Sequence, residues 1–91
     1  MKDKVIVTVV GKDKVGIIAG VTAALAKAEV NILDISQTIM QDFFTMIMIC
    51  DMSKADMDLS SLKETMDAEG KSIGVNITVQ HEKIFQFMHR I

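Results

Sequence analysis

The order of strand-like and helix-like segments is the feature that most constrains the fold of this chain. A run of mostly β-branched residues over 4–10 ends at Gly11, and a helical pattern runs from Gly16 to about residue 29. The later segments are a strand over 31–40, a tight turn at 41–42, a strand over 43–51, a polar connection over 52–57, a helix from near Asp58 to Gly74, and a strand over 75–80. The predicted order is therefore βαββαβ.

Apolar patterning predicts how these strands are arranged. Residues 4–10 and 43–51 are apolar on both faces, which is typical of central strands covered on two sides. Residues 75–80 alternate between apolar and polar, as expected of an edge strand. Two right-handed crossovers then give an α+β fold with one four-stranded antiparallel sheet, in which the first and third strands are central and both helices lie on one face.

Each helix is expected to bury one face against the sheet. We predict that Asp58 caps the start of the second helix and that Gly74 ends it. Gly70 inside this helix costs about 1 kcal/mol relative to alanine and predicts an irregular last turn. The predicted buried residues are Ile18, Val21, Leu25 and Ala28 in the first helix and Leu59, Leu62, Met66 and Ile73 in the second.

The helices leave the second face of the sheet open, although the central strands are apolar there as well. Large apolar surfaces are rarely left in water. The C-terminal tail, residues 80–91, is predicted to be a short amphipathic helix that covers this face of its own sheet or reaches a second subunit. Its apolar stripe consists of Ile84, Phe87, Met88 and Ile91. We therefore expect a homodimer, and two such dimers could pair further.

Length and composition narrow the class of protein. The 91 residues make one domain, 1–91. The longest apolar run, 15–26, is shorter than the roughly 18–20 residues that cross a bilayer, and no signal-peptide pattern opens the chain. The single cysteine, Cys50, lies in an apolar run, which predicts a buried thiol and a cytoplasmic protein. The net charge is −2, with lysines spread singly and one arginine, Arg90, so we expect no direct contact with nucleic acid.

The loop between the first strand and the first helix is the best candidate for a binding site. Glycine has no Cβ, so backbone N–H groups can come close to a small anion, and a helix N-terminus favours negative charge. A nucleotide-binding loop would need Lys-Ser/Thr after Gly16, and Ile17-Ile18 follow instead, which argues against ATP or GTP. The alternative is a turn in which the glycines merely permit a positive φ.

The pattern Gly11-x-Asp13-x-x-Gly16-Ile17, together with Asn31-Ile32, resembles the signature of the ACT domain, a small regulatory module that usually binds an amino acid. The resemblance covers essentially the whole chain and implies the ferredoxin-like βαββαβ fold. One departure is Val15, where the family often has proline, so that the loop is less rigidly preset.

In ligand-binding ACT dimers the effector lies at the subunit interface, where loop amides contact it and the asparagine side chain supplies a donor and an acceptor. By this resemblance Asp13 would meet an ammonium group and the helix start a carboxylate. Alternatively, Asp13 is a solvated loop charge or turn cap and Asn31 a turn residue at the strand start. The resemblance implies ligand-binding positions at Gly11, Lys12, Asp13, Lys14, Val15, Gly16, Ile17, Asn31 and Ile32.

The C-terminal residues resemble one particular group of ACT proteins. Ile84-Phe85-x-x-Met88-His89-Arg90-Ile91 is similar to the tail of a family of stand-alone ACT proteins from bacteria and archaea. The glycine cleavage system repressor, also built from ACT modules, resembles the chain more loosely.

The sequence contains few of the patterns that are typical of an enzyme active site. No serine lies in a nucleophile-elbow pattern, and His81 and His89 lack the spacing of a metal site. Phosphohydrolases that resemble acylphosphatase share the fold but need an arginine in the first loop, which here holds only Lys12 and Lys14. We therefore expect a non-enzyme without metal or cofactor.

Two functions remain open. The first is an allosteric homodimer that senses an amino acid or a similar small zwitterion and passes its state to a partner protein. The second is a structural or protein-interaction dimer with an empty ligand site.

Overall fold

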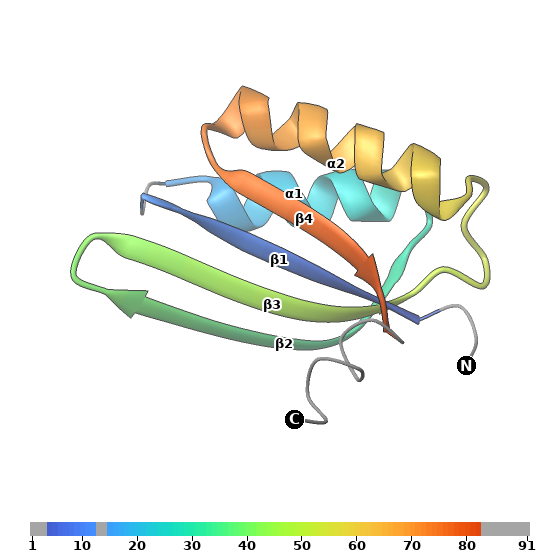
Figure 1. The fold of residues 1–91 in the computed structure, drawn as a ribbon, viewed down its shortest axis with the longest axis horizontal. Coiled ribbons are helices and arrows are strands. Elements are labelled where there is room, and N and C mark those ends of the chain that lie inside the picture. The colour runs from blue at the N-terminus through green and yellow to red at the C-terminus, as the bar shows by residue number, and fades with distance from the viewer. Residues whose placement is uncertain (1–3, 13–14, 83–91) are drawn as a thin grey trace.

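The computed structural model describes residues 4–12 and 15–82 and confirms the predicted order of elements (Figure 1). β1 continues two residues beyond its predicted end, and α1 stops two residues before its predicted end. The elements are β1 (Lys4–Lys12), α1 (Ile17–Lys27), β2 (Asn31–Met40), β3 (Phe43–Asp51), α2 (Leu59–Ile73) and β4 (Asn76–His81).

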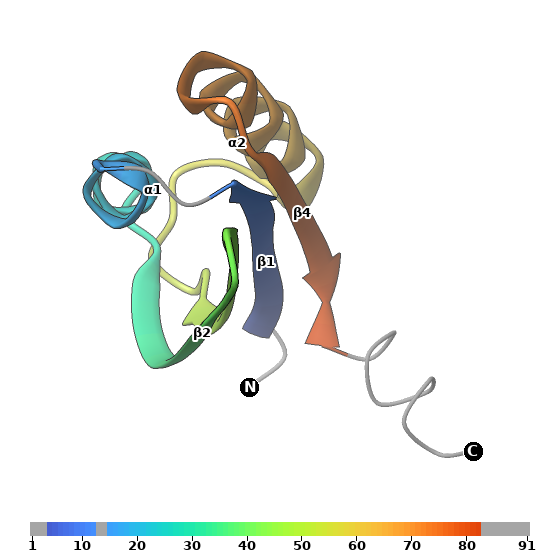
Figure 2. The ribbon, with the colours of Figure 1, turned by 90° about the vertical axis from the view of Figure 1, so that its left-hand side faces the viewer.

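The four strands form one antiparallel sheet in the order β2-β3-β1-β4. The central and edge positions are therefore those that the apolar patterning predicts. Both helices lie on one face, with α2 over β4 and α1 beside it toward the β2 side (Figure 2). The fold is the ferredoxin-like arrangement that the resemblance to the ACT domain implied.

The core lies between the helices and the inner face of the two central strands. α1 contributes Ile17, Val21 and Leu25, all nearly or fully buried, whereas Ile18 is 40% exposed. The prediction that Ile18 is buried was therefore wrong by one position, because both 17 and 18 fit a 3.6-residue stripe with Val21 and Leu25. The strands contribute Val5, Val7, Val9, Phe44, Met46, Met48 and Cys50.

The start of α2 has the predicted cap. Asp58 is extended, and its carboxylate accepts a hydrogen bond from the Ser61 amide at 2.9 Å. The helix ends at Gly74, which has a φ of 93°. Leu62 and Met66 are fully buried, while Leu59 and Ile73 are partly buried and pack against the core. The predicted buried face of this helix is thus confirmed, although its two ends are only half covered.

Hydrogen bonds from Ser61 lower the pKa of the Asp58 carboxyl below its ordinary value. A lowered native pKa contributes stability that is complete above the unfolded pKa of about 3.9 and is lost as the pH falls through the native value. We therefore expect Asp58→Ala to lower the melting temperature at pH 7, and the gap to wild type to narrow as the pH falls below about 4. Thermal melts from pH 3 to 7 measure this. Asp56→Ala, which removes a nearby exposed carboxylate, is the matched control; an equal effect from both would contradict a cap-specific role.

Gly70 does not make the last turn of α2 irregular, contrary to the prediction. The helix continues to Ile73, and Gly70 is buried inside it. A Cβ atom at this position would lie 2.7 Å from the backbone oxygen of Val75. The amides of Gly74 and Val75 both donate to the Gly70 carbonyl, at 2.7 and 2.9 Å. Gly70 is therefore required by the close return of the chain into β4.

β2 is a ten-residue edge strand with little cover on either face. Its pairing with β3 contains an irregularity between Ile32 and Asp34, which places the intervening Leu33 out of register. Leu33, Ile35 and Ile39 are 42–55% exposed. Among the strands that the structure describes, this one carries the most apolar surface without a partner.

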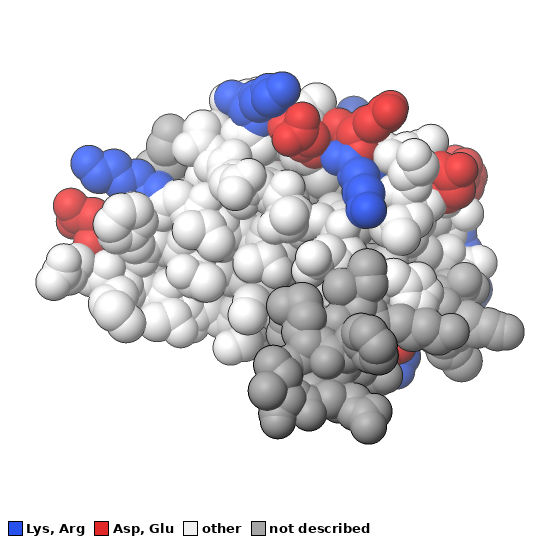
Figure 3. Space-filling view, in the orientation of Figure 1, with Lys and Arg blue, Asp and Glu red and all other residues white. Residues whose placement is uncertain are grey.

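The sheet face opposite the helices is the face seen in Figure 3. Apart from the charged side chains at its end near Lys12, the half of this face toward that end is white in Figure 3. Val10, Phe43 and Ile47 on the two central strands are exposed. Gln80 and His81, the first residues of the tail predicted to be helical, belong to β4 instead. The rest of the tail lies outside the described residues from Lys83 onward.

Two further expectations concern the thiol and the membrane. Cys50 is fully buried, as predicted, and burial raises the pKa of its thiol to about 11. Among the described residues, no helix is long and apolar enough to span a bilayer.

Candidate functional site

The loop between β1 and α1 is an open turn. Gly11 and Lys12 end β1, residues 13–14 lie outside the described part, and Val15 is fully exposed. Gly16 is the N-cap of α1 with a φ of 94°, and no atom lies within 4 Å of where its Cβ would be. The positive φ explains the second glycine of the motif, because other residues rarely adopt it.

The start of α1 has no side-chain cap among the described residues and no acidic residue in its first turn. The Gly20 amide donates to the Gly16 carbonyl at 2.9 Å. The amides before it, those of Ile17 to Ala19, have no acceptor one turn earlier in the helix. The contrast with α2, capped by Asp58, leaves the start of α1 as a place where an anionic group would be favoured.

The identities of two of the loop residues are explained by packing within the chain. A Cβ on Gly11 would lie 2.7 Å from Cγ1 of Val75, so the missing side chain makes room for Val75. The Ile17 side chain is buried in the core, with 2% of it exposed. These two positions can therefore meet a ligand only through their backbone.

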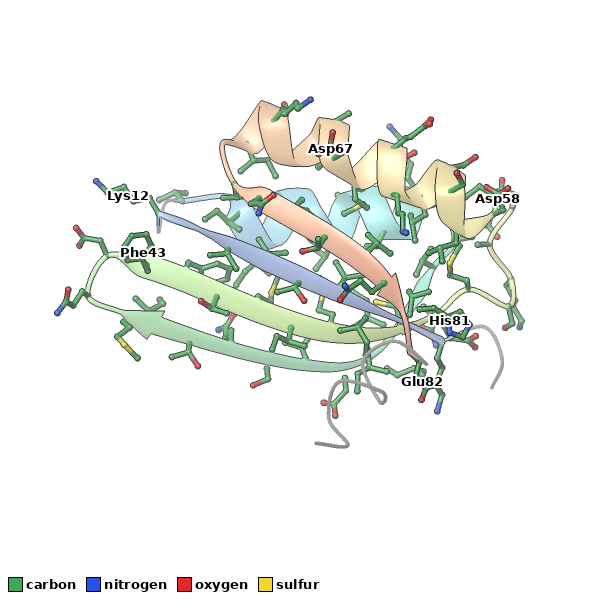
Figure 4. All side chains as sticks on the ribbon, in the orientation of Figure 1. Lys12, Phe43, Asp58, Asp67, His81 and Glu82 are labelled. Carbon is green, nitrogen blue, oxygen red and sulfur yellow. The ribbon has the colours of Figure 1, made fainter. Side chains whose placement is uncertain are left out.

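Asn31 lies at the other end of the sheet from the loop. It pairs with Asp51 at the end where β1 begins, whereas Met40 pairs with Phe43, which pairs with Lys12. Figure 4 shows Lys12 and Phe43 at one end and His81 at the opposite end. Nine-residue strands rising about 3.3 Å per residue separate these ends by roughly 26 Å. One chain therefore does not bring the loop and Asn31 together.

Asn31 borders an open pocket of about 590 Å³ at the end of α1. The Asp51 carboxylate in this pocket accepts hydrogen bonds from the Ser53 amide at 3.0 Å and the Ser53 hydroxyl at 3.1 Å, which lower the pKa of Asp51. Ile32, by contrast, is half-buried and packs against the core. The lining residues are Ala26, Glu29, Val30, Asn31, Asp51, Ser53 and Lys54.

The pocket combines both signs of charge. Glu29 and Asp51 are acidic, Lys54 is basic, and the Asn31 amide can donate and accept. Sequence reasoning missed Glu29, although it lies two residues before Asn31. It also missed Asp51, Ser53 and Lys54, which only the pairing of β2 with β3 places beside Asn31. The pocket is chemically suited to the ammonium and carboxylate of a zwitterion.

The rest of the described surface provides weaker candidates for a ligand site. A hollow of about 610 Å³ between α1 and α2 is bordered by Gly20, Ala24 and other residues, none of which belongs to the predicted site. Among the described residues, no group of three or more His, Cys, Asp or Glu side chains is placed to hold a metal ion.

Comparison with known proteins identifies the family. The chain is similar to the UPF0237 protein of Methanosarcina acetivorans, with 57% identity over 86 residues that cover 94% of each chain. It is also similar to the ACT domain protein from Streptococcus pneumoniae, with 43% identity and a TM-score of 0.81 over 90% of this chain and 92% of that one. It shares the fold alone with a protein described as a glycine cleavage system transcriptional repressor (22% identity, TM-score 0.74, 85% of this chain and 44% of that one). Residues 3–80 match the family model of the ACT domain, and the chain therefore belongs to the ACT domain family, as a relative of the UPF0237 proteins.

Proposed function

We propose that this protein is a regulatory homodimer that binds an amino acid between two copies of the chain. ACT domains are regulatory modules, often amino-acid binding, rather than catalytic ones. The observation that carries the proposal is the separation of the loop and Asn31 to opposite ends of the sheet. Only a second chain can complete a site that needs both.

The free edge of β2 is the surface on which the two copies pair in this proposal. An edge strand presents a row of backbone N–H and C=O groups that can pair with another strand. β2 is long, has no described strand on its outer side, and carries exposed Leu33, Ile35 and Ile39. Pairing would continue the sheet across the two copies and cover Ile35 near the middle of the strand.

Antiparallel pairing of two β2 strands about a twofold axis brings the halves of the site together. The axis would pass near the middle of β2, close to Ile35, and all helices would lie on the same face. Asn31 of one copy would then lie near Met40 of the other, at the end of the sheet where the loop is found. Each dimer would contain two such sites.

The chemistry of the two halves is complementary. The uncapped start of α1 suits a carboxylate, and the pocket around Asn31, with ionised Asp51 and with Glu29, suits an ammonium group. An effector that bridges the copies would favour one arrangement of the dimer over others. Binding would thereby shift the population of dimer arrangements and change the surface that a partner protein contacts.

Thermal melts with each of the twenty amino acids test the proposal. The effector at 100 times its Kd should stabilise the protein by about 2.7 kcal/mol. Asn31→Ala should remove this stabilisation, whereas Asn76→Ala, which changes another exposed strand asparagine on β4, should retain it. A monomer at micromolar concentration by light scattering would overturn the proposal.

The second candidate is a structural or protein-interaction dimer with an empty site. It is favoured by Val15, which leaves the loop without the family's proline, and by Val75, which fills the space beside Gly11. A dimer that responds to none of the amino acids at millimolar concentration would identify this function instead.

A further inference from the structure

We infer that the effector is an amino acid with a bulky aliphatic side chain, such as leucine, isoleucine or valine. The inference rests on the proposed function, because it concerns what surrounds the same bridging site. It is based on exposed apolar side chains that lie beside the loop and are not part of the core.

Val15 and Ile39 lie at the loop end of the sheet. Val15 is fully exposed directly before the start of α1. Ile39 pairs with Phe44, which pairs with Gly11, and 55% of Ile39 is exposed. These two aliphatic residues therefore stand on either side of the uncapped helix start, one in the loop and one on β2.

Ile18 joins them from the first turn of α1. Gly20 faces α2, because a Cβ there would lie 2.8 Å from Cδ1 of Ile73. Ile18, two residues earlier, is turned about 160° around the helix axis and so faces away from α2, toward the β2 side. Its neighbour on that side, Thr22, donates its hydroxyl to the Ile18 carbonyl at 2.8 Å, which gives the hydroxyl proton an acceptor within the helix.

Pairing of the β2 strands would not cover this aliphatic group. Ile35, near the twofold axis, would meet the partner strand, but Val15, Ile18 and Ile39 lie toward the loop end. There the other copy would contribute Asn31 and its polar pocket, with Leu33 as the nearest exposed apolar residue. A ligand with a charged head and an aliphatic tail would match both sides, the head in the polar pocket and the tail against Val15, Ile18 and Ile39.

The expected selectivity follows from side-chain size. Burying one methylene group is worth roughly a fourfold gain in affinity. Leucine should therefore bind on the order of 50-fold more tightly than alanine, since the two share the same charged groups. Serine, glutamate and lysine should bind more weakly than leucine, because their polar ends would be buried without partners.

Calorimetric titration of the full chain with glycine, alanine, valine, leucine, isoleucine, serine, glutamate and lysine tests the inference. Ile18→Ser should weaken leucine binding about tenfold and leave alanine binding nearly unchanged. Ile47→Ser, at a similarly exposed isoleucine on the open sheet face, should change neither and is the matched control. Both substitutions are at exposed positions, and circular dichroism with light scattering verifies that fold and dimer persist.

The outcomes separate the two proposals. Tightest binding by a polar or charged amino acid, or an equal loss of alanine and leucine binding in Ile18→Ser, would overturn the aliphatic class while the proposed function stands. Binding of none of the amino acids by a stable dimer would overturn the proposed function, and the inference with it.

Discussion

Replacing Ile35 with lysine is expected to convert the dimer to a monomer at micromolar concentration. Ile35 is 42% exposed and lies in the middle of β2. In the proposed pairing it therefore lies close to Ile35 of the other copy, across the twofold axis. The substitution removes apolar contact worth about 1.5–3 kcal/mol and brings two like charges together. We expect the dissociation constant of the dimer to rise at least 100-fold, which corresponds to a loss of roughly 2.8 kcal/mol in the free energy of association.

Light scattering and sedimentation across a concentration series measure this change. Ile47→Lys is the matched control, because Ile47 is 38% exposed but lies on the open sheet face. Monomers from Ile47→Lys and dimers from Ile35→Lys would show that the copies meet through the sheet face instead. The Ile35→Lys monomer should also lose its melting response to the effector, since neither half of the site is complete alone.

Gly70→Ala, which replaces the one glycine within α2, is expected to destabilise the protein. Alanine improves helix propensity by about 1 kcal/mol, but its Cβ would lie 2.7 Å from the Val75 carbonyl, a backbone atom that cannot rotate away. Overpacking of this kind costs roughly 1–3 kcal/mol, so the clash should outweigh the gain. At 4–8 °C per kcal/mol for a domain of this size, a net loss of up to about 2 kcal/mol should lower Tm by up to roughly 16 °C.

Urea and thermal unfolding measure this effect. Ser72→Ala, at an exposed position of the same helix, should be neutral or slightly stabilising and separates propensity from packing. A Tm for Gly70→Ala at or above that of wild type would mean that the return of the chain into β4 can shift without cost.

Local chemistry explains which features could be predicted from the sequence. The element order, the two central strands and the tight turn follow from apolar periodicity and from chain reversals over a few residues. The cap at Asp58 depends on a bond to Ser61 only three residues away. The resemblance to the ACT domain likewise depends on a contiguous loop pattern and on Asn31 at the start of β2.

Packing between distant segments explains what the sequence alone did not predict. Periodicity could not decide between Ile17 and Ile18, because both positions fit the stripe and only contact with the sheet selects one. Gly11 and Gly70 are explained by Val75, which follows α2 and lies far from Gly11 in the sequence.

The strands, the helices and the family signature can be predicted from the amino-acid sequence, because each depends on residues close together in the chain. The placement of the parts of the site follows from the folded chain alone, because antiparallel pairing sets Asn31 beside Asp51 and leaves the loop at the opposite end of the sheet. A motif whose parts are separated by the length of a strand cannot act within one chain, and this geometric fact makes a second copy part of the proposed site.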